Sequence, residues 1–152
     1  MADNPLVGTW RLMSFEVRGA DGRVRFPYGR DAAGYIMYGA DGFMSVQFGP
    51  ADRPRFADDD FAGKSDGEWA AIARGYTSYC GRYELRGDRV LHHVELSLFP
   101  NWIGQTQERF LSLDGDRVTL RTPPFRVRGE ERTGVLVWER VAQAPRGGEE
   151  EG

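Results

Sequence analysis

Polar side chains alternate with apolar ones along residues 91–98, which read Leu-His-His-Val-Glu-Leu-Ser-Leu. In a β-strand successive side chains point to opposite faces, so His93, Glu95 and Ser97 would share one face. His92 would then lie on the other face, which is otherwise apolar. A histidine beside a carboxylate can gain or release a proton near neutral pH. The polar face of this strand is therefore the first candidate for chemistry.

The segment that follows is predicted to supply the opposing strand. Residues 99–104 contain the Pro, Asn and Gly that are typical of a chain reversal, and residues 105–113 resume a strand-like pattern. The predicted cross-strand pairs are Ser97 with Gln105, Glu95 with Gln107, and His93 with Arg109. A register shifted by one residue would present Thr106, Glu108 and Phe110 to the polar row instead.

Two further strands are predicted beside this hairpin. Residues 76–85 precede it across a turn at 86–88, and residues 116–122 follow it across Asp114-Gly115. The first places Tyr83 opposite Leu91, Gly81 opposite His93 and Tyr79 opposite Glu95. The second places Leu120 opposite Arg109, with its alternate residues solvated. Both patterns predict that the polar row faces the enclosed side of the sheet.

These positions define a predicted site. The predicted catalytic residues are His93, Glu95, Arg109 and Tyr79. His93 and Glu95 would exchange a proton with a carbonyl compound, while Arg109 would hold an oxyanion. The predicted ligand contacts are Tyr83, Ser97, Gln107, Leu120 and Trp69. An equally weighted alternative is a purely structural role, in which a buried polar network fixes the strand register.

No metal site and no cofactor are predicted. Neighbouring strand residues diverge, so His92 and His93 cannot chelate one ion, and one His with one Glu is an incomplete ligand set. His92 is interpreted as structural, and Cys80 as a small packed residue. Haem ligation by a single His remains a lower alternative.

Composition limits the class of protein. The chain has 152 residues, of which 40% are hydrophobic, which favours one domain; we expect it to span residues 1–141, with a disordered tail at 142–152. A net charge of -3 without a basic run gives no reason to expect a nucleic-acid partner. A single cysteine, no signal peptide and no long apolar run predict a cytoplasmic protein that does not enter a membrane.

The order of the remaining elements favours an all-β fold. A first strand is predicted at residues 8–18, and Asp41-Gly42 lies between strand-like runs as in a hairpin. Residues 49–75 form a long irregular segment, in which Ser65 opens a short helix through a capping box. The closing strand at residues 133–140 would pair with the first. The prediction is a roughly eight-stranded antiparallel up-and-down barrel with one short helix in a long loop.

Several motifs resemble those of the bacterial and fungal lipocalin-like domain family, a calycin-type small barrel. They are Leu6-Val7-Gly8-Thr9-Trp10, Gly34-Tyr35-Ile36-Met37-Tyr38, His92-His93-Val94-Glu95, Ser97 through Trp102 and Leu136-Val137-Trp138, in an order that covers about residues 6–141. The resemblance implies a barrel that binds a hydrophobic ligand. Small calycin-like barrels elsewhere act as cofactor-free cyclases. The chain differs from secreted lipocalins in lacking a signal peptide and paired cysteines.

Two classes of function follow, and the sequence leaves them open. One is a cofactor-independent enzyme of natural-product metabolism, an isomerase, cyclase or dehydratase, and the prediction leans towards it. The other is a non-catalytic carrier or sensor of a small hydrophobic molecule. A structural or dimerisation module is disfavoured because it gains little from an interior polar row. Monomer and homodimer both remain open.

Overall fold

The computed structural model describes residues 3–142. Its elements in chain order are β1 (Gly8–Gly19), β2 (Val24–Arg25), β3 (Ala32–Tyr38), β4 (Phe43–Pro50), α1 (Asp66–Arg74), β5 (Thr77–Arg86), β6 (Arg89–Ser97), the 3-10 turn η1 (Pro100–Trp102), β7 (Thr106–Asp114), β8 (Arg117–Arg121), β9 (Phe125–Val127) and β10 (Glu130–Arg140). No helix within residues 3–142 is long and apolar enough to cross a membrane.

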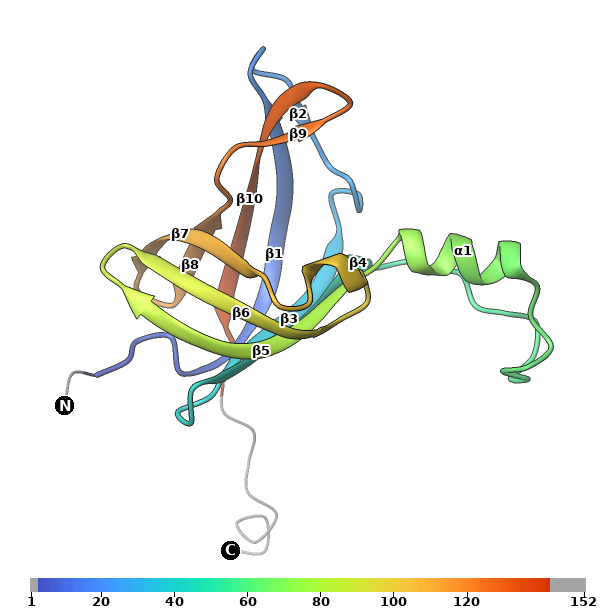
Figure 1. Cartoon of the computed structure of the whole chain (residues 1–152), viewed down its shortest axis with the longest axis horizontal. Coiled ribbons are helices and arrows are strands. Elements are labelled where there is room, and N and C mark those ends of the chain that lie inside the picture. Colours follow the sequence, from blue (N-terminus) through green and yellow to red (C-terminus); the bar gives the residue numbers. More distant parts are fainter. Residues whose placement is uncertain (1–2, 143–152) are drawn as a thin grey trace, which may run out of the picture.

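Eight of the strands close into an antiparallel barrel (Figure 1). The order around the barrel is β1-β3-β4-β5-β6-β7-β8-β10, and β10 pairs back onto β1 along most of its length. Closure leaves no unpaired edge in the barrel wall. The predicted all-β barrel, including pairing of the last strand with the first, is confirmed.

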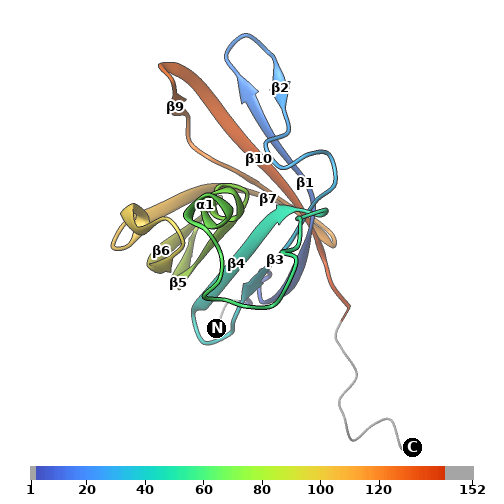
Figure 2. The ribbon, with the colours of Figure 1, turned by 90° about the vertical axis from the view of Figure 1, so that its right-hand side faces the viewer.

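Two short strands extend one end of the barrel. β2 pairs with β1, and β9 pairs with β10, at the end away from the N-terminus (Figure 2). The closing strand was predicted at residues 133–140, but β10 begins at Glu130 and pairs with β9, so a further hairpin precedes the predicted strand.

A β-bulge interrupts the β5–β6 pair. Cys80 pairs with Leu96 and Gly81 pairs with Val94, which leaves Glu95 as the extra residue of β6. Gly81 is required here, since a Cβ at this position would lie 1.9 Å from the carbonyl oxygen of His93. The bulge bends the strand and reverses the alternation of side chains beyond it.

The N-terminal segment closes the other end of the barrel. Leu6 is fully buried in the core, and its carbonyl accepts a hydrogen bond from the Trp10 indole at 2.9 Å. Arg140 lies over the Trp10 ring and donates to the carbonyl of Val7. Strand β1 thereby begins against closely packed side chains.

Helix α1 lies outside the barrel wall, to the right of it in Figure 1. Ser65 accepts a hydrogen bond from the backbone of Glu68, whose side chain accepts one from the backbone of Ser65, so the predicted capping box is confirmed. The helix has no buried residue. Capping chemistry, more than packing, therefore defines where it begins.

The predicted boundaries of the domain remain a prediction. Residues 143–152, which make up nearly all of the predicted disordered tail, lie outside the described residues.

Candidate functional site

The barrel encloses a cavity of about 580 Å³. All eight barrel strands contribute to its wall. Its apolar side chains include Phe15, Ile36, Val46, Phe48, Leu136 and Trp138. Its polar side chains include Tyr79, His92, Gln107, Arg109 and Thr122. The polar groups gather on β5, β6 and β7, while the apolar wall is built largely by β1, β3, β4 and β10, so the cavity has two chemically different sides.

His92 is the central polar group of this wall. Its side chain is buried at 1% exposure, and its two ring nitrogens bind two tyrosine hydroxyls. Nε2 lies 2.7 Å from the Tyr38 hydroxyl and Nδ1 lies 2.8 Å from that of Tyr79. Burial lowers the pKa of His92 well below 6.5, and the positive charge of Arg109 lowers it further. The imidazole is therefore neutral.

The hydrogen-bond partners fix which nitrogen carries the proton. Within residues 3–142 the buried Tyr38 hydroxyl has His92 as its hydrogen-bond partner, so it donates to Nε2. Either arrangement leaves one phenol proton over. On Tyr38, which does not line the cavity, that proton would have no acceptor, at a cost of about 1–3 kcal/mol, whereas Tyr79 lines the cavity. Nδ1–H then donates to Tyr79. The Tyr79 hydroxyl proton remains to be donated into the cavity that this residue lines.

Arg109 adds a positive charge next to this network. It is half-buried on β7 and lines the cavity. Its guanidinium donates to the carbonyl of Glu108 at 2.8 Å and to the side-chain oxygen of Gln107 at 3.4 Å. Burial raises the pKa of the Tyr79 hydroxyl, and the charge of Arg109 partly offsets that rise. The cavity therefore holds a cation, a neutral imidazole and a protonated phenol side by side.

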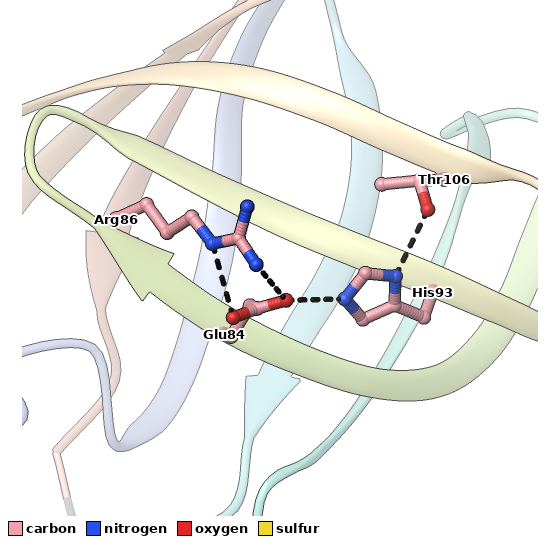
Figure 3. A network of polar contacts seen from close by, with 4 residues as sticks. All are labelled: Glu84, Arg86, His93 and Thr106. Carbon is pink, nitrogen blue, oxygen red and sulfur yellow. Dashed lines mark hydrogen bonds and ion pairs between the residues drawn. The ribbon is translucent and has the colours of Figure 1, made fainter.

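His93 lies on the outer surface of the barrel, so its predicted place in the interior is wrong (Figure 3). Its Nε2 donates to Glu84 at 2.8 Å, and its Nδ1 lies 2.9 Å from the Thr106 hydroxyl. Arg86 donates to the same carboxylate, at 3.2 Å. The hydrogen bond from His93 and the charge of Arg86 lower the pKa of Glu84.

Glu95 is also outside the cavity. It is the exposed extra residue of the bulge and contacts neither His93 nor Arg109 through a hydrogen bond or ion pair within the described chain. The predicted constellation of His93, Glu95 and Arg109 therefore does not form.

Strand register explains both errors. The β5–β6 turn has two residues, Gly87 and Asp88, so Arg86 pairs with Arg89 and Tyr83 pairs with His92. The predicted turn, Arg86-Gly87-Asp88, is one residue longer, and a shift of one residue in the pairing moves every side chain to the other face. Across β6 and β7, His93 faces Thr106, three residues away from its predicted partner Arg109, so neither the predicted pairing nor the one shifted by a single residue forms.

Of the other predicted site residues, some line the cavity and some do not. Tyr79, Gln107, Arg109 and Leu120 line the cavity. Tyr83 points inward but does not line it, since its hydroxyl donates to the carbonyl of Gly39 near the closed end.

Ser97 and Trp69 lie away from the cavity. Ser97 accepts a hydrogen bond from the backbone of Phe99 in the turn. Trp69 packs against Phe56 and Phe61 on the external loop, with ring centroids 5.4 and 6.1 Å from its own. Neither is in a position to contact a ligand in the barrel.

Three residues place polar groups in the barrel interior although the sequence did not predict them there. They are Tyr38, His92 and Trp138. Trp138 is 1% exposed and lines the cavity, and its indole N–H has no hydrogen-bond partner within residues 3–142. The Gly87-Asp88 pair was the available signal for His92, because a two-residue turn of this type fixes the hairpin register.

A closed eight-stranded up-and-down barrel around an internal cavity defines the lipocalin-like class of fold. The profile of the lipocalin-like domain family matches residues 7–141, and the chain belongs to this family. The chain is also similar to the 4'-hydroxy-3'-methoxypropiophenone carrier protein of Aspergillus oryzae. The two are 36% identical over 107 residues, which cover 64% of this chain and 96% of that protein.

Proposed function

We propose that this protein binds a small aromatic molecule inside the barrel and carries it without changing it. The observation that supports this most directly is the cavity of about 580 Å³ inside a closed wall. Its size falls within the range of about 300–1,000 Å³ that is usual for sites that bind small molecules.

The apolar side of the cavity suits an aromatic ring. Phe48 packs edge-to-face with Phe15 and with Trp138, at centroid distances of 5.4 and 6.2 Å. Such rings offer flat and edge contacts to another ring, which favours aromatic guests over flexible chains. The polar side, with Tyr79 and Arg109, would orient oxygen atoms on the same guest.

The ketone in the name of the similar protein also combines an apolar ring with polar oxygen atoms. A 4'-hydroxy-3'-methoxypropiophenone molecule is an aromatic ketone with a phenolic hydroxyl and a methoxy group. A ring with oxygen atoms at its ends matches an apolar wall that faces polar groups. This match supports a carrier of an aromatic ketone or a related phenol.

Direct binding of this ketone tests the proposal. Titration calorimetry should give saturable binding of one molecule per chain, with a Kd on the order of micromolar. Leu120→Trp should abolish it by filling the cavity, and Val46→Phe should weaken it from the opposite wall. Leu96→Trp is the matched control, because Leu96 is exposed on the outer surface. Absence of binding by the wild-type chain, or full binding by a folded Leu120→Trp variant, would refute the proposal.

A cofactor-free enzyme is the second candidate, and the chain of Tyr38, His92 and Tyr79 favours it. A hydrogen-bonded imidazole between two phenols can relay a proton to a carbonyl oxygen. With the carbonyl oxygen protonated, loss of a proton from the adjacent carbon to the solvent would give the enol. Return of a deuteron from heavy water to that carbon would complete the exchange. NMR of the ketone in heavy water separates the two candidates, because a carrier leaves the exchange rate unchanged and an enzyme accelerates it.

The haem alternative receives no support from the donor set. Both nitrogens of His92 are occupied by tyrosine hydroxyls, and His93 is bound to Glu84 and Thr106 on the outside. Neither imidazole presents a nitrogen to an iron in the cavity.

A further inference from the structure

We propose that the cavity selects a ligand with an anionic oxygen group, a carboxylate or a phenolate, which binds between the Arg109 guanidinium and the Tyr79 hydroxyl. This inference rests on the proposed function, because it specifies the ligand of the same cavity. It specifies that one oxygen group of the proposed aromatic ligand is negatively charged.

The positive charge of Arg109 has no counter-ion in the described chain. None of the ion pairs within residues 3–142 includes Arg109. Its hydrogen bonds go to a backbone carbonyl and an amide oxygen, which are neutral acceptors. A half-buried guanidinium without an anion retains unused capacity to bind a carboxylate or phenolate.

Glu108, which precedes Arg109 in the chain, is already paired with another arginine. Glu108 follows the outward register of β7, opposite Leu91, and its carboxylate accepts a hydrogen bond from Arg89 at 2.6 Å. Glu108 is the one other charged residue among those that line the cavity. The interior therefore offers a net positive charge to a guest.

Tyr79 supplies a second donor beside this charge. The proton order around His92 leaves the Tyr79 hydroxyl free to donate into the cavity. A guanidinium and a phenol together can bind the two oxygens of a carboxylate or the single oxygen of a phenolate, and bonds to an ionised acceptor are stronger than bonds to a neutral one.

Trp138 provides an independent indication that a ligand supplies a hydrogen-bond acceptor in the cavity. Its buried indole N–H has no partner within the described residues, although it belongs to a residue of the cavity wall. Buried donors of this kind are normally paired. A guest with a second oxygen, such as a methoxy or carbonyl group, could provide the missing acceptor.

A pair of probes of almost equal shape tests the charge preference. 2-Naphthoate and 2-acetylnaphthalene differ in that one carries a carboxylate oxygen where the other has a methyl group. Titration calorimetry at neutral pH should show that 2-naphthoate binds at least about tenfold more tightly. Arg109→Met should remove this preference, and Arg109→Lys should retain part of it.

Matched variants separate this charge effect from a general loss of structure. Arg117→Met removes an exposed arginine of β8, which lies near Glu139, and should leave the preference unchanged. Tyr79→Phe should weaken 2-naphthoate more than 2-acetylnaphthalene, by about threefold or more. Unfolding curves for each variant confirm that the barrel is intact.

The outcomes distinguish this inference from the proposed function. Equal affinity for the two probes, or a preference that survives in Arg109→Met, overturns the anionic ligand but leaves the carrier proposal standing. If the wild-type chain binds neither probe nor the aromatic ketone, the carrier proposal fails and the inference fails with it.

Discussion

His92 and His93 are neighbours in the chain and lie on opposite sides of the same barrel wall. His92 is enclosed by two tyrosine hydroxyls, whereas His93 shares an exposed network with Glu84, Arg86 and Thr106. The two have the same chemistry in isolation. Burial makes His92 a neutral side chain of the cavity wall, whereas His93 forms a hydrogen bond with a carboxylate on the surface.

The same contrast continues on β7. Thr106 is exposed and hydrogen-bonded to His93, although it also borders the cavity, whereas the half-buried Gln107, which pairs with His92, and Arg109 belong to the polar side of the cavity. The alternation of a β-strand thus converts one sequence into two unrelated polar networks. This teaches that register, more than residue type, decides which polar group can meet a ligand.

The largest effect on this contrast is expected from Gly81→Ala. The added Cβ would lie 1.9 Å from the His93 carbonyl oxygen and 2.9 Å from the Glu95 amide nitrogen, so the bulge could not keep its shape. We expect a loss of about 4 kcal/mol in the free energy of unfolding, measured by urea denaturation.

Gly67→Ala is the control for that substitution. Gly67 lies in α1, where an added Cβ meets nothing within 4 Å, so its stability should change by less than about 1 kcal/mol. A Gly81→Ala variant as stable as the wild type would contradict the close approach of the two strands at the bulge.

Replacing each histidine by alanine measures the contrast directly. His92→Ala leaves the Tyr38 and Tyr79 hydroxyls without their shared partner in the interior, and should cost about 3 kcal/mol. His93→Ala should cost much less, because its partners remain accessible to water. Equal losses in urea unfolding would show that the two positions do not differ in burial.

The pH dependence of stability should belong to His92. Its pKa in the folded state is lowered below 6.5, so the unfolded chain binds a proton that the folded chain does not. The contribution of His92 to the free energy of unfolding is therefore fully present above pH 6.5. As the pH falls below 6.5, the free energy of unfolding decreases by at most about 1.4 kcal/mol per pH unit.

One variant checks that assignment. His92→Gln should show a flatter stability profile between neutral and mildly acidic pH. A His92→Gln profile as steep as that of the wild type would contradict the assignment to His92.

The smallest effect is expected from Glu84→Gln on the outer network. The pKa of Glu84 is lowered by its hydrogen bond from His93, so the stabilising charge is present at neutral pH and is lost as the carboxylate is protonated in acid. Because the group is exposed, high salt should reduce the difference between wild type and Glu84→Gln. The difference between wild type and His92→Gln should be insensitive to salt.

Local chemistry was sufficient for much of the fold. The Ser65 capping box, the Asp41-Gly42 hairpin and the alternation along β8 each depend on a few neighbouring residues, and each was found where the sequence predicted it. Pairing of the first and last strands also followed, since an open sheet of this length would expose its edges.

The inner face of β6 depends on more distant information. A turn shorter by one residue than predicted placed His93 outward and His92 inward, and the bulge then left Glu95 without a partner on β5. Tyr79 and Arg109 both line the cavity, as predicted. The bulge restores the alternation for Tyr79. The predicted pair of Leu120 with Arg109 is wrong, because Leu120 pairs with Leu111, but a difference of two residues leaves Arg109 on the same face.

The sequence by itself determined an eight-stranded barrel of the lipocalin-like kind and the segments that bear its polar groups. Only the tertiary structure decided that His92, held between Tyr38 and Tyr79, is the imidazole of the interior. The physical reason is that side chains alternate with a period of two residues, so a displacement of a single residue exchanges the inside of a barrel for its outside.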